Sequence, residues 1–167
     1  MKNFVLFGKP GSGKGTQAEH LSEKYKLYHI STGDLFRKNI SQNTNLGLLA
    51  QSYMDKGELV PDEVTIKMLE NEIKENQQSK GFLFDGFPRT IAQAESLDKF
   101  LKSIDMQINA TIALDVDEEE LISRIIDRGK TSNRSDDQDI EKIQNRFNEY
   151  NMKTSTLSKY YKDQKKF

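Results

Sequence analysis

A short glycine-rich run near the amino terminus holds the residues best suited to chemistry. It reads Gly8-Lys9-Pro10-Gly11-Ser12-Gly13-Lys14-Gly15-Thr16 and follows an apolar, strand-like segment at residues 4–7. Glycines let the backbone wrap an anion with its N–H groups turned inward, and a helix that begins at about Lys14 points its positive end at the same anion. Lys14 adds a point charge, and Thr16 offers a hydroxyl near a metal ion. The run therefore predicts a phosphate-binding loop.

The spacing Gly-x4-Gly-Lys fits the P-loop pattern with one departure. Gly15 stands where that pattern has Ser or Thr, and Thr16 comes one position later. The residues predicted to hold the phosphates of a nucleotide are Gly11, Ser12, Gly13, Lys14, Gly15 and Thr16.

A second motif, Asp85-Gly86-Phe87-Pro88-Arg89-Thr90, follows another apolar strand. An Asp at the end of a strand beside a P-loop can hold water on Mg²⁺. Arg89 then projects from the same turn toward the phosphates. The alternative is an ordinary strand-to-helix turn with a capping Asp85.

Both motifs resemble those of adenylate kinases and their nucleoside monophosphate kinase relatives, and the similarity runs from Met1 to about Tyr161. The resemblance implies the reaction ATP + AMP ⇌ 2 ADP with Mg²⁺. It also implies an α/β, three-layer P-loop NTPase fold, with a parallel sheet, a helical monophosphate-binding insertion and a short lid loop. The short-lid form needs no zinc.

The resemblance also assigns an AMP site. Thr32 and Arg37 match residues of the monophosphate-binding flap, and residues 58–60 match its return segment. Gln93 matches the family's adenine-reading glutamine, whose amide offers a donor and an acceptor together. The full set is Thr32, Arg37, Glu58, Leu59, Val60, Gly86, Phe87, Pro88, Arg89, Gln93, Arg134 and Arg146.

Relatives that phosphorylate UMP or CMP usually depart from the family pattern at Thr32 and Gln93, and this chain does not, so AMP is favoured. A kinase for another monophosphate remains an alternative. So does a nucleotide-binding module that has lost turnover.

Six of the 25 Lys and Arg residues are arginines, and a guanidinium grips phosphate oxygens in pairs. A compositional bias is the alternative reading. Arg124 and Arg128 lie four residues apart and share one helix face. The resemblance places both of them at ATP, and places them with Arg134 and Arg146 around the transferred phosphoryl group. The predicted catalytic residues are Lys14, Arg89, Arg124, Arg134 and Arg146.

The acidic run at residues 115–120 suggests a metal site at first sight, but a helix start is favoured. Asp117 would cap that helix, and Glu120 would complete the capping box. His20 and His29 have no partners at ligand spacing and are expected to be structural or exposed.

Strand-like and helical patterns alternate along the chain, which predicts a parallel sheet covered on both faces. Strands are expected at residues 4–7, 28–31, 81–85 and 110–114. Residues 31–60 are helical only and read as a flap, and residues 128–138 as the lid loop. The core then comprises residues 1–30, 61–127 and 139–167.

The last predicted helix carries Ile140, Ile143, Phe147 and Tyr150 on one face. The family continues with a fifth strand and a final helix, whereas this sequence stops at Phe167. Either the sequence is truncated or the ATP base is held less completely, and the fourth strand would then have an exposed edge.

The composition of the chain further limits the class of protein to which it can belong. A chain of 167 residues is most simply one domain, and its net charge of −1 gives no basic footprint for nucleic acid. The absence of cysteine removes disulfides and thiolate metal sites. No signal peptide or membrane span is evident. A cytoplasmic protein that binds ATP, AMP and ADP is expected, with a monomer as the default.

Overall fold

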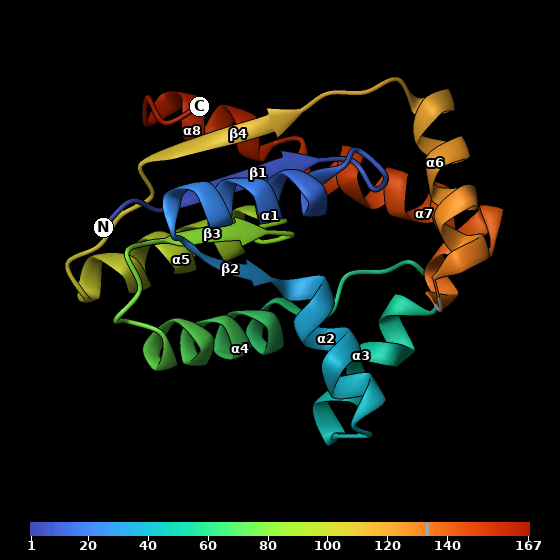
Figure 1. Ribbon diagram of the computed structural model, residues 1–167, viewed down its shortest axis with the longest axis horizontal. Coiled ribbons are helices and arrows are strands. Elements are labelled where there is room, and N and C mark those ends of the chain that lie inside the picture. The colour runs from blue at the N-terminus through green and yellow to red at the C-terminus, as the bar shows by residue number, and fades with distance from the viewer. Residues whose placement is uncertain (133) are drawn as a thin grey trace.

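The computed structural model describes residues 1–132 and 134–167 (Figure 1). Its sheet is parallel throughout, in the order β2-β3-β1-β4, which confirms the predicted fold class. The strands are β1 (Phe4–Gly8), β2 (Tyr28–Ser31), β3 (Phe82–Asp85) and β4 (Ala110–Leu114). Because the strands run in one direction, their carboxyl ends and the loops that follow meet at one edge.

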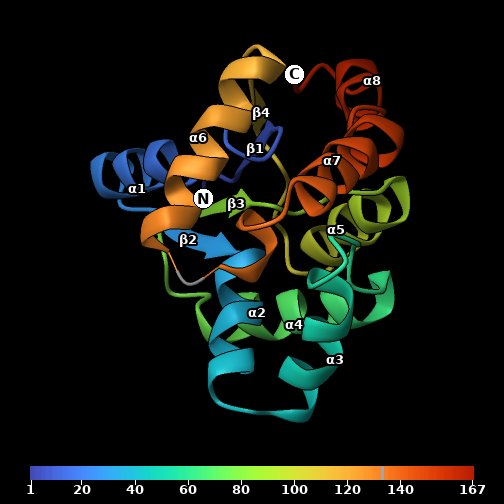
Figure 2. The same cartoon turned by 90° about the vertical axis from the view of Figure 1, so that its right-hand side faces the viewer.

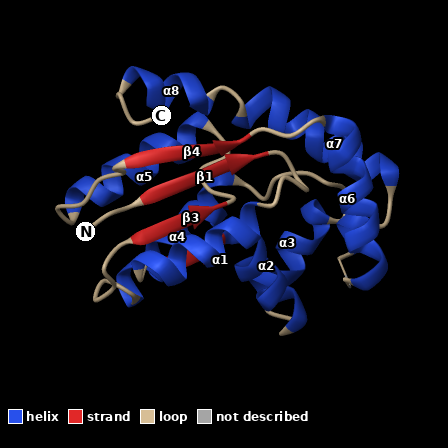
Figure 3. Ribbon diagram, turned by 45° about the horizontal axis from the view of Figure 1, so that its top comes forward, coloured by secondary structure: helices blue, strands red, loops and turns tan. Residues whose placement is uncertain are grey.

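Helices lie on both faces of the sheet (Figure 3). They are α1 (Lys14–Tyr25), α2 (Thr32–Ser41), α3 (Asn45–Met54), α4 (Asp62–Glu75), α5 (Ile91–Ser103), α6 (Glu118–Thr131), α7 (Ile140–Glu149) and α8 (Leu157–Asp163). A 3₁₀ turn covers Ser135–Asp137, and a π-helical segment covers Tyr150–Thr154.

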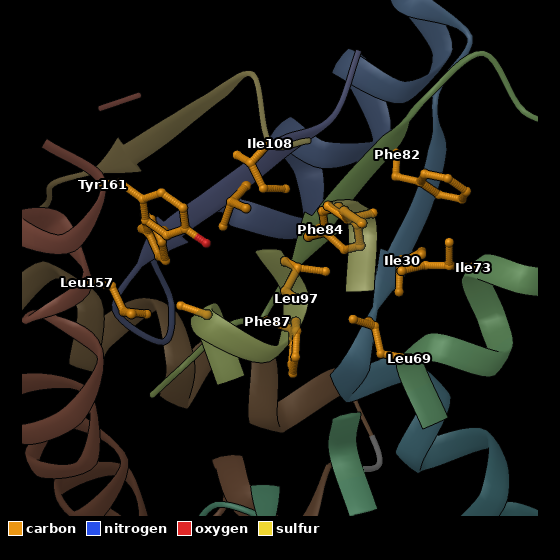
Figure 4. Packing of buried hydrophobic residues seen from close by; sticks show 14 residues of the cluster. Ile30, Leu69, Ile73, Phe82, Phe84, Phe87, Leu97, Ile108, Leu157 and Tyr161 are labelled. Carbon is orange, nitrogen blue, oxygen red and sulfur yellow. The ribbon is translucent and has the colours of Figure 1, made fainter. Parts of the chain in front are cut away.

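The alternation of side chains along β1 divides the core into two layers. Val5 and Phe7 point to the face covered by α4, α5 and α8, and Leu6 points to the face covered by α1. Figure 4 shows the larger layer, in which Phe84 and Leu97 lie between Tyr161 of α8 and Ile73 of α4.

Asn3 is fully buried and joins the starts of three strands. Its backbone N–H donates to Asn109 Oδ1 at 2.7 Å, and its Nδ2 donates to the Gln107 carbonyl at 2.9 Å. Its Oδ1 accepts from the Phe82 N–H at 3.0 Å. This side chain therefore satisfies backbone groups at the end of the sheet opposite the phosphate loop.

Helices α2 and α3 form a hairpin with its own small core of Phe36, Ala50 and Val60. A Cβ at Gly47 would lie 2.2 Å from the Asn39 carbonyl oxygen, so glycine is what lets the two helices approach. Viewed from the strand ends, the hairpin lies on one side of the sheet edge and α6 and α7 lie on the other (Figure 2).

Three details differ from the sequence-based expectations. Helix α6 continues to Thr131, so the loop begins after Thr131 rather than at residue 128. Asp117 is the N-cap of α6 but makes no side-chain capping bond, and Glu120 pairs with Arg124 rather than closing a capping box. Ile140 is 68% exposed, and only the later apolar residues of α7 pack against α6.

The outer edge of β4 is covered at one point. The Lys166 carbonyl accepts from the Thr111 N–H at 2.6 Å and from Thr111 Oγ1 at 2.9 Å. The expected exposed edge is therefore wrong at Thr111, because the chain returns to it after α8.

Within the two described ranges, none of the helices combines the length and the apolar character needed to cross a membrane.

Candidate active site

A cavity opens at the carboxyl edge of the sheet, between the phosphate loop, the α2–α3 hairpin and α7. Many of the residues predicted to bind nucleotide line it. The lining includes Gly8, Lys14, Thr32, Arg37, Glu58, Leu59, Val60, Gly86, Pro88, Arg89, Gln93, Asp136, Arg146, Glu149, Tyr150 and Thr154.

The phosphate loop has the backbone shape of an anion cradle. Gly11 and Gly13 have φ angles of 83° and 85°, a region that favours glycine. A Cβ at Gly11 would also meet Ile125 of α6 at 2.9 Å. Helix α1 begins at Lys14 without a side-chain cap, which leaves its first N–H groups for a ligand.

The Lys14 ammonium folds back over the loop, where its Nζ donates to the Gly8 carbonyl at 2.7 Å and the Lys9 carbonyl at 3.1 Å. The pKa of Lys14 is lowered to about 8, chiefly by burial. The guanidinium groups of Arg89, Arg146 and Arg128 contribute to this lowering, and Asp85 opposes it. A site that gathers this much positive charge is suited to a polyanionic ligand.

Arg89 is held at three points. Its Nε donates to the Gly86 carbonyl at 2.7 Å, and its backbone N–H donates to Gln93 Oε1 at 2.7 Å. Its carbonyl accepts from Thr154 Oγ1 at 3.0 Å, a hydroxyl presented by the π-helical segment. Burial lowers the pKa of Arg89, and Arg146 adds to the effect. The backbone of Arg89 and one edge of its guanidinium are therefore held in place by the protein itself.

Asp137 joins the predicted lid to α7. Its carboxylate accepts from Arg128 Nε at 2.6 Å and Nη2 at 2.8 Å, and from Arg146 Nη1 at 2.8 Å. Burial by itself raises the pKa of Asp137, but the hydrogen bonds from Arg128 and Arg146 outweigh it and keep that pKa below its usual value. Sequence reasoning gave Asp137 no role, although its place after Arg134 in a short polar loop was a usable signal.

Several predicted residues do not line the cavity. Arg124 is exposed and pairs with Glu120, and Phe87 is a core residue. The Nη2 atom of Arg134 lies 3.8 Å from Oδ1 of Asp34, a residue of the hairpin. Thr16 is exposed on α1. Their predicted ligand contacts remain predictions. The same holds for Gly11, Ser12, Gly13, Gly15 and Arg128.

Asp85 ends β3 next to the phosphate loop, where His29 Nε2 lies 3.7 Å from its Oδ2. Among residues 1–132 and 134–167, no group of three or more metal-ligating side chains occurs. Mg²⁺ commonly binds through one or two carboxylates together with phosphates and waters, so a lone carboxylate beside a phosphate loop fits this ion.

The parallel sheet, the loop after β1 and the cations that converge on one cavity define a P-loop protein that handles phosphate groups.

A family model described as adenylate kinase matches residues 6–166, and the chain belongs to that family. It is 66% identical to an adenylate kinase of Flavobacterium psychrophilum and 61% identical to one of Flavobacterium johnsoniae. An adenylate kinase of Bacteroides fragilis is 50% identical. Each match covers all of this chain and 88% of the relative. These findings confirm the predicted family, and with it a phosphotransferase that binds nucleotides.

Proposed function

We propose that the protein transfers the γ-phosphoryl group of Mg²⁺-bound ATP to AMP, reversibly, and so maintains the balance of adenine nucleotides. One observation carries the proposal: Lys14, Arg89 and Arg146 line a single cavity that both the phosphate loop and the α2–α3 hairpin border. A monomeric state and a cytoplasmic location belong to the same proposal and rest on the family alone.

In this proposal the two nucleotides enter from opposite sides. The ATP phosphates lie on the start of α1 and on Lys14. The AMP phosphate lies on Arg37 and Arg89. An AMP phosphate oxygen forms a bond to the γ-phosphorus, and the bond from that phosphorus to the β,γ-bridging oxygen breaks. Two ADP molecules result, and because the acceptor is already an anion near pH 7, no general base is needed.

Catalysis then depends on position and charge. Arg89 and Arg146 each lower the pKa of Lys14, which indicates that the cations repel one another before a ligand arrives. The phosphates relieve this repulsion, most strongly where charge builds up during transfer. Bound Mg²⁺, held through water by Asp85, would neutralise charge on the phosphate chain.

Water must be excluded, because it would otherwise take the phosphoryl group from ATP. The hairpin already touches the opposite wall: Asn145 Nδ2 donates to the Lys56 carbonyl at 2.7 Å, and Asp34 lies 3.8 Å from Arg134. These contacts support a hairpin that closes over AMP.

The test is an assay of ADP formation from ATP with AMP, CMP or UMP as acceptor, and with no acceptor. We expect rapid turnover with AMP and Mg²⁺ only. Equal turnover with CMP would identify a kinase for another monophosphate. Binding of ATP with no ADP formed would instead identify a nucleotide-binding module without turnover.

A further inference from the structure

Gln93 is held by a closed ring of hydrogen bonds at the back of the cavity. Its Nε2 donates to Asp62 Oδ1 at 2.7 Å, and its Oε1 accepts from the Arg89 N–H at 2.7 Å. The other Asp62 oxygen, Oδ2, accepts from Thr90 Oγ1 at 2.8 Å, and that hydroxyl accepts from the Gln93 backbone N–H at 3.1 Å. The ring therefore joins the first turn of α4 to the first turn of α5.

The chemistry of the two partners determines which way the carboxamide faces. A backbone N–H can only donate, so it holds the oxygen of the amide. A carboxylate can only accept, so it holds the nitrogen. Gln93 is 2% exposed, and a reversed amide would set two donors together at Arg89 and two acceptors together at Asp62.

Asp62 lies behind Gln93, outside the lining of the cavity. Gln93 lines the cavity, whereas Asp62 does not. Beyond the two bonds described, the Gln93 carboxamide keeps one N–H and one acceptor lone pair. This free acceptor and this free donor match adenine, because the N6 amino group of adenine donates to the carboxamide oxygen and its N1 accepts from the carboxamide N–H. A 6-keto purine presents the reverse, with an accepting O6 and a donating N1–H.

We infer that Asp62 is a positioning residue that sets the orientation of the Gln93 carboxamide and so lets the site select a 6-amino over a 6-keto purine monophosphate. The inference rests on the proposed function, in which Gln93 faces the acceptor base. Asp62 is suited to this role because a carboxylate in the first turn of α4 is also stabilised by the positive end of that helix.

The experiment compares Asp62→Asn with the matched control Glu63→Gln. Both variants remove one negative charge from the first turn of α4, but Glu63 is exposed and lies outside the ring. For Asp62→Asn we expect the KM for AMP to rise about tenfold with kcat changed less than about twofold, and the preference for AMP over IMP to fall by a similar factor. Glu63→Gln should leave all three values within about twofold.

A double-mutant cycle separates positioning from general damage. In a Gln93→Ala background, Asp62→Asn should change the KM for AMP less than twofold, since the residue through which it acts is gone. An unchanged tenfold effect in that background would overturn the inference, as would Asp62→Asn behaving like Glu63→Gln.

A second readout does not depend on activity. The side-chain N–H signals of Gln93, assigned by their loss in Gln93→Ala, should exchange with solvent at least about tenfold faster in Asp62→Asn than in Glu63→Gln. Equal exchange overturns the positioning role even in an active enzyme. Absence of ADP formation in the unaltered protein would instead count against the proposed function, and this measurement would still decide the role of Asp62.

Discussion

The burial of the charged Lys14 side chain lowers the stability of the folded protein, although the proposed function requires this charge. The folded protein encloses its ammonium among arginines and lowers its pKa from 10.5 to about 8. The unfolded chain therefore holds this proton more tightly than the folded chain does. Below pH 8 the cost to stability is fully present, and it disappears as the pH rises toward 10.5.

We predict that the stability of the protein relative to Lys14→Met increases between pH 7 and pH 10.5. The gain should be roughly 1–2 kcal/mol, which is less than the full pKa shift would give because the side chain is partly exposed. Urea unfolding of both proteins at the two pH values measures it. Lys24→Met, which removes an exposed lysine from the same helix, is the matched control for the loss of one positive charge. A difference that is flat with pH would contradict the assigned pKa.

At the scale of elements, the α2–α3 hairpin forms one wall of the cavity. Its two helices meet at Gly47 and share a core separate from that of the sheet. Because this core is small, its packing can be disturbed without unfolding the parallel sheet.

We predict that Gly47→Ala loosens this hairpin, because a Cβ would lie 2.2 Å from a backbone oxygen of α2 and 2.6 Å from a backbone nitrogen. The loss of stability should be about 1–3 kcal/mol, as for other overpacked sites. The KM for AMP should rise several-fold, with a smaller change in the KM for ATP. Leu49→Ala, at a 40% exposed position of α3, is the control. Equal increases in the KM for AMP and the KM for ATP would contradict a role for the hairpin in binding AMP specifically.

At the scale of the whole molecule, charge is distributed unevenly. The net charge is only −1, yet Lys14, Arg37, Arg89 and Arg146 all line one cavity. Glu58, Asp136 and Glu149 line the same cavity, so the attraction of these cations for an anion acts at short range, on a phosphate group placed among them. Salt screens this attraction.

We predict that raising NaCl from 20 to about 300 mM weakens AMP binding several-fold, while the binding of adenosine changes little. The two ligands share a base and differ in the phosphate, so the comparison isolates the charge on the ligand. Calorimetric titration at each salt concentration measures both affinities. Equal salt dependence for the two ligands would show that the cationic cluster does not govern binding.

Local patterns predicted the strands and the phosphate loop well. The apolar run before Gly8 and the glycine spacing after it involve neighbours in sequence, and their conformations follow from those neighbours. The expected capping box at Asp117 and Glu120 is absent, and Glu120 instead pairs with Arg124, one turn further on. The exposed Ile140 shows the same limit, since helical periodicity cannot tell which apolar residue meets a partner.

By itself, the sequence determined that a phosphate cradle, a second loop with Asp85 and Arg89, and a parallel sheet would occur together, because short-range sterics and hydrophobic periodicity suffice for each. Only the tertiary structure decided that Asp137 would bridge Arg128 and Arg146 and that Asp62 would hold Gln93. The partners in the second pair are 31 residues apart, and whether two such side chains meet depends on how α4 and α5 pack rather than on either segment alone.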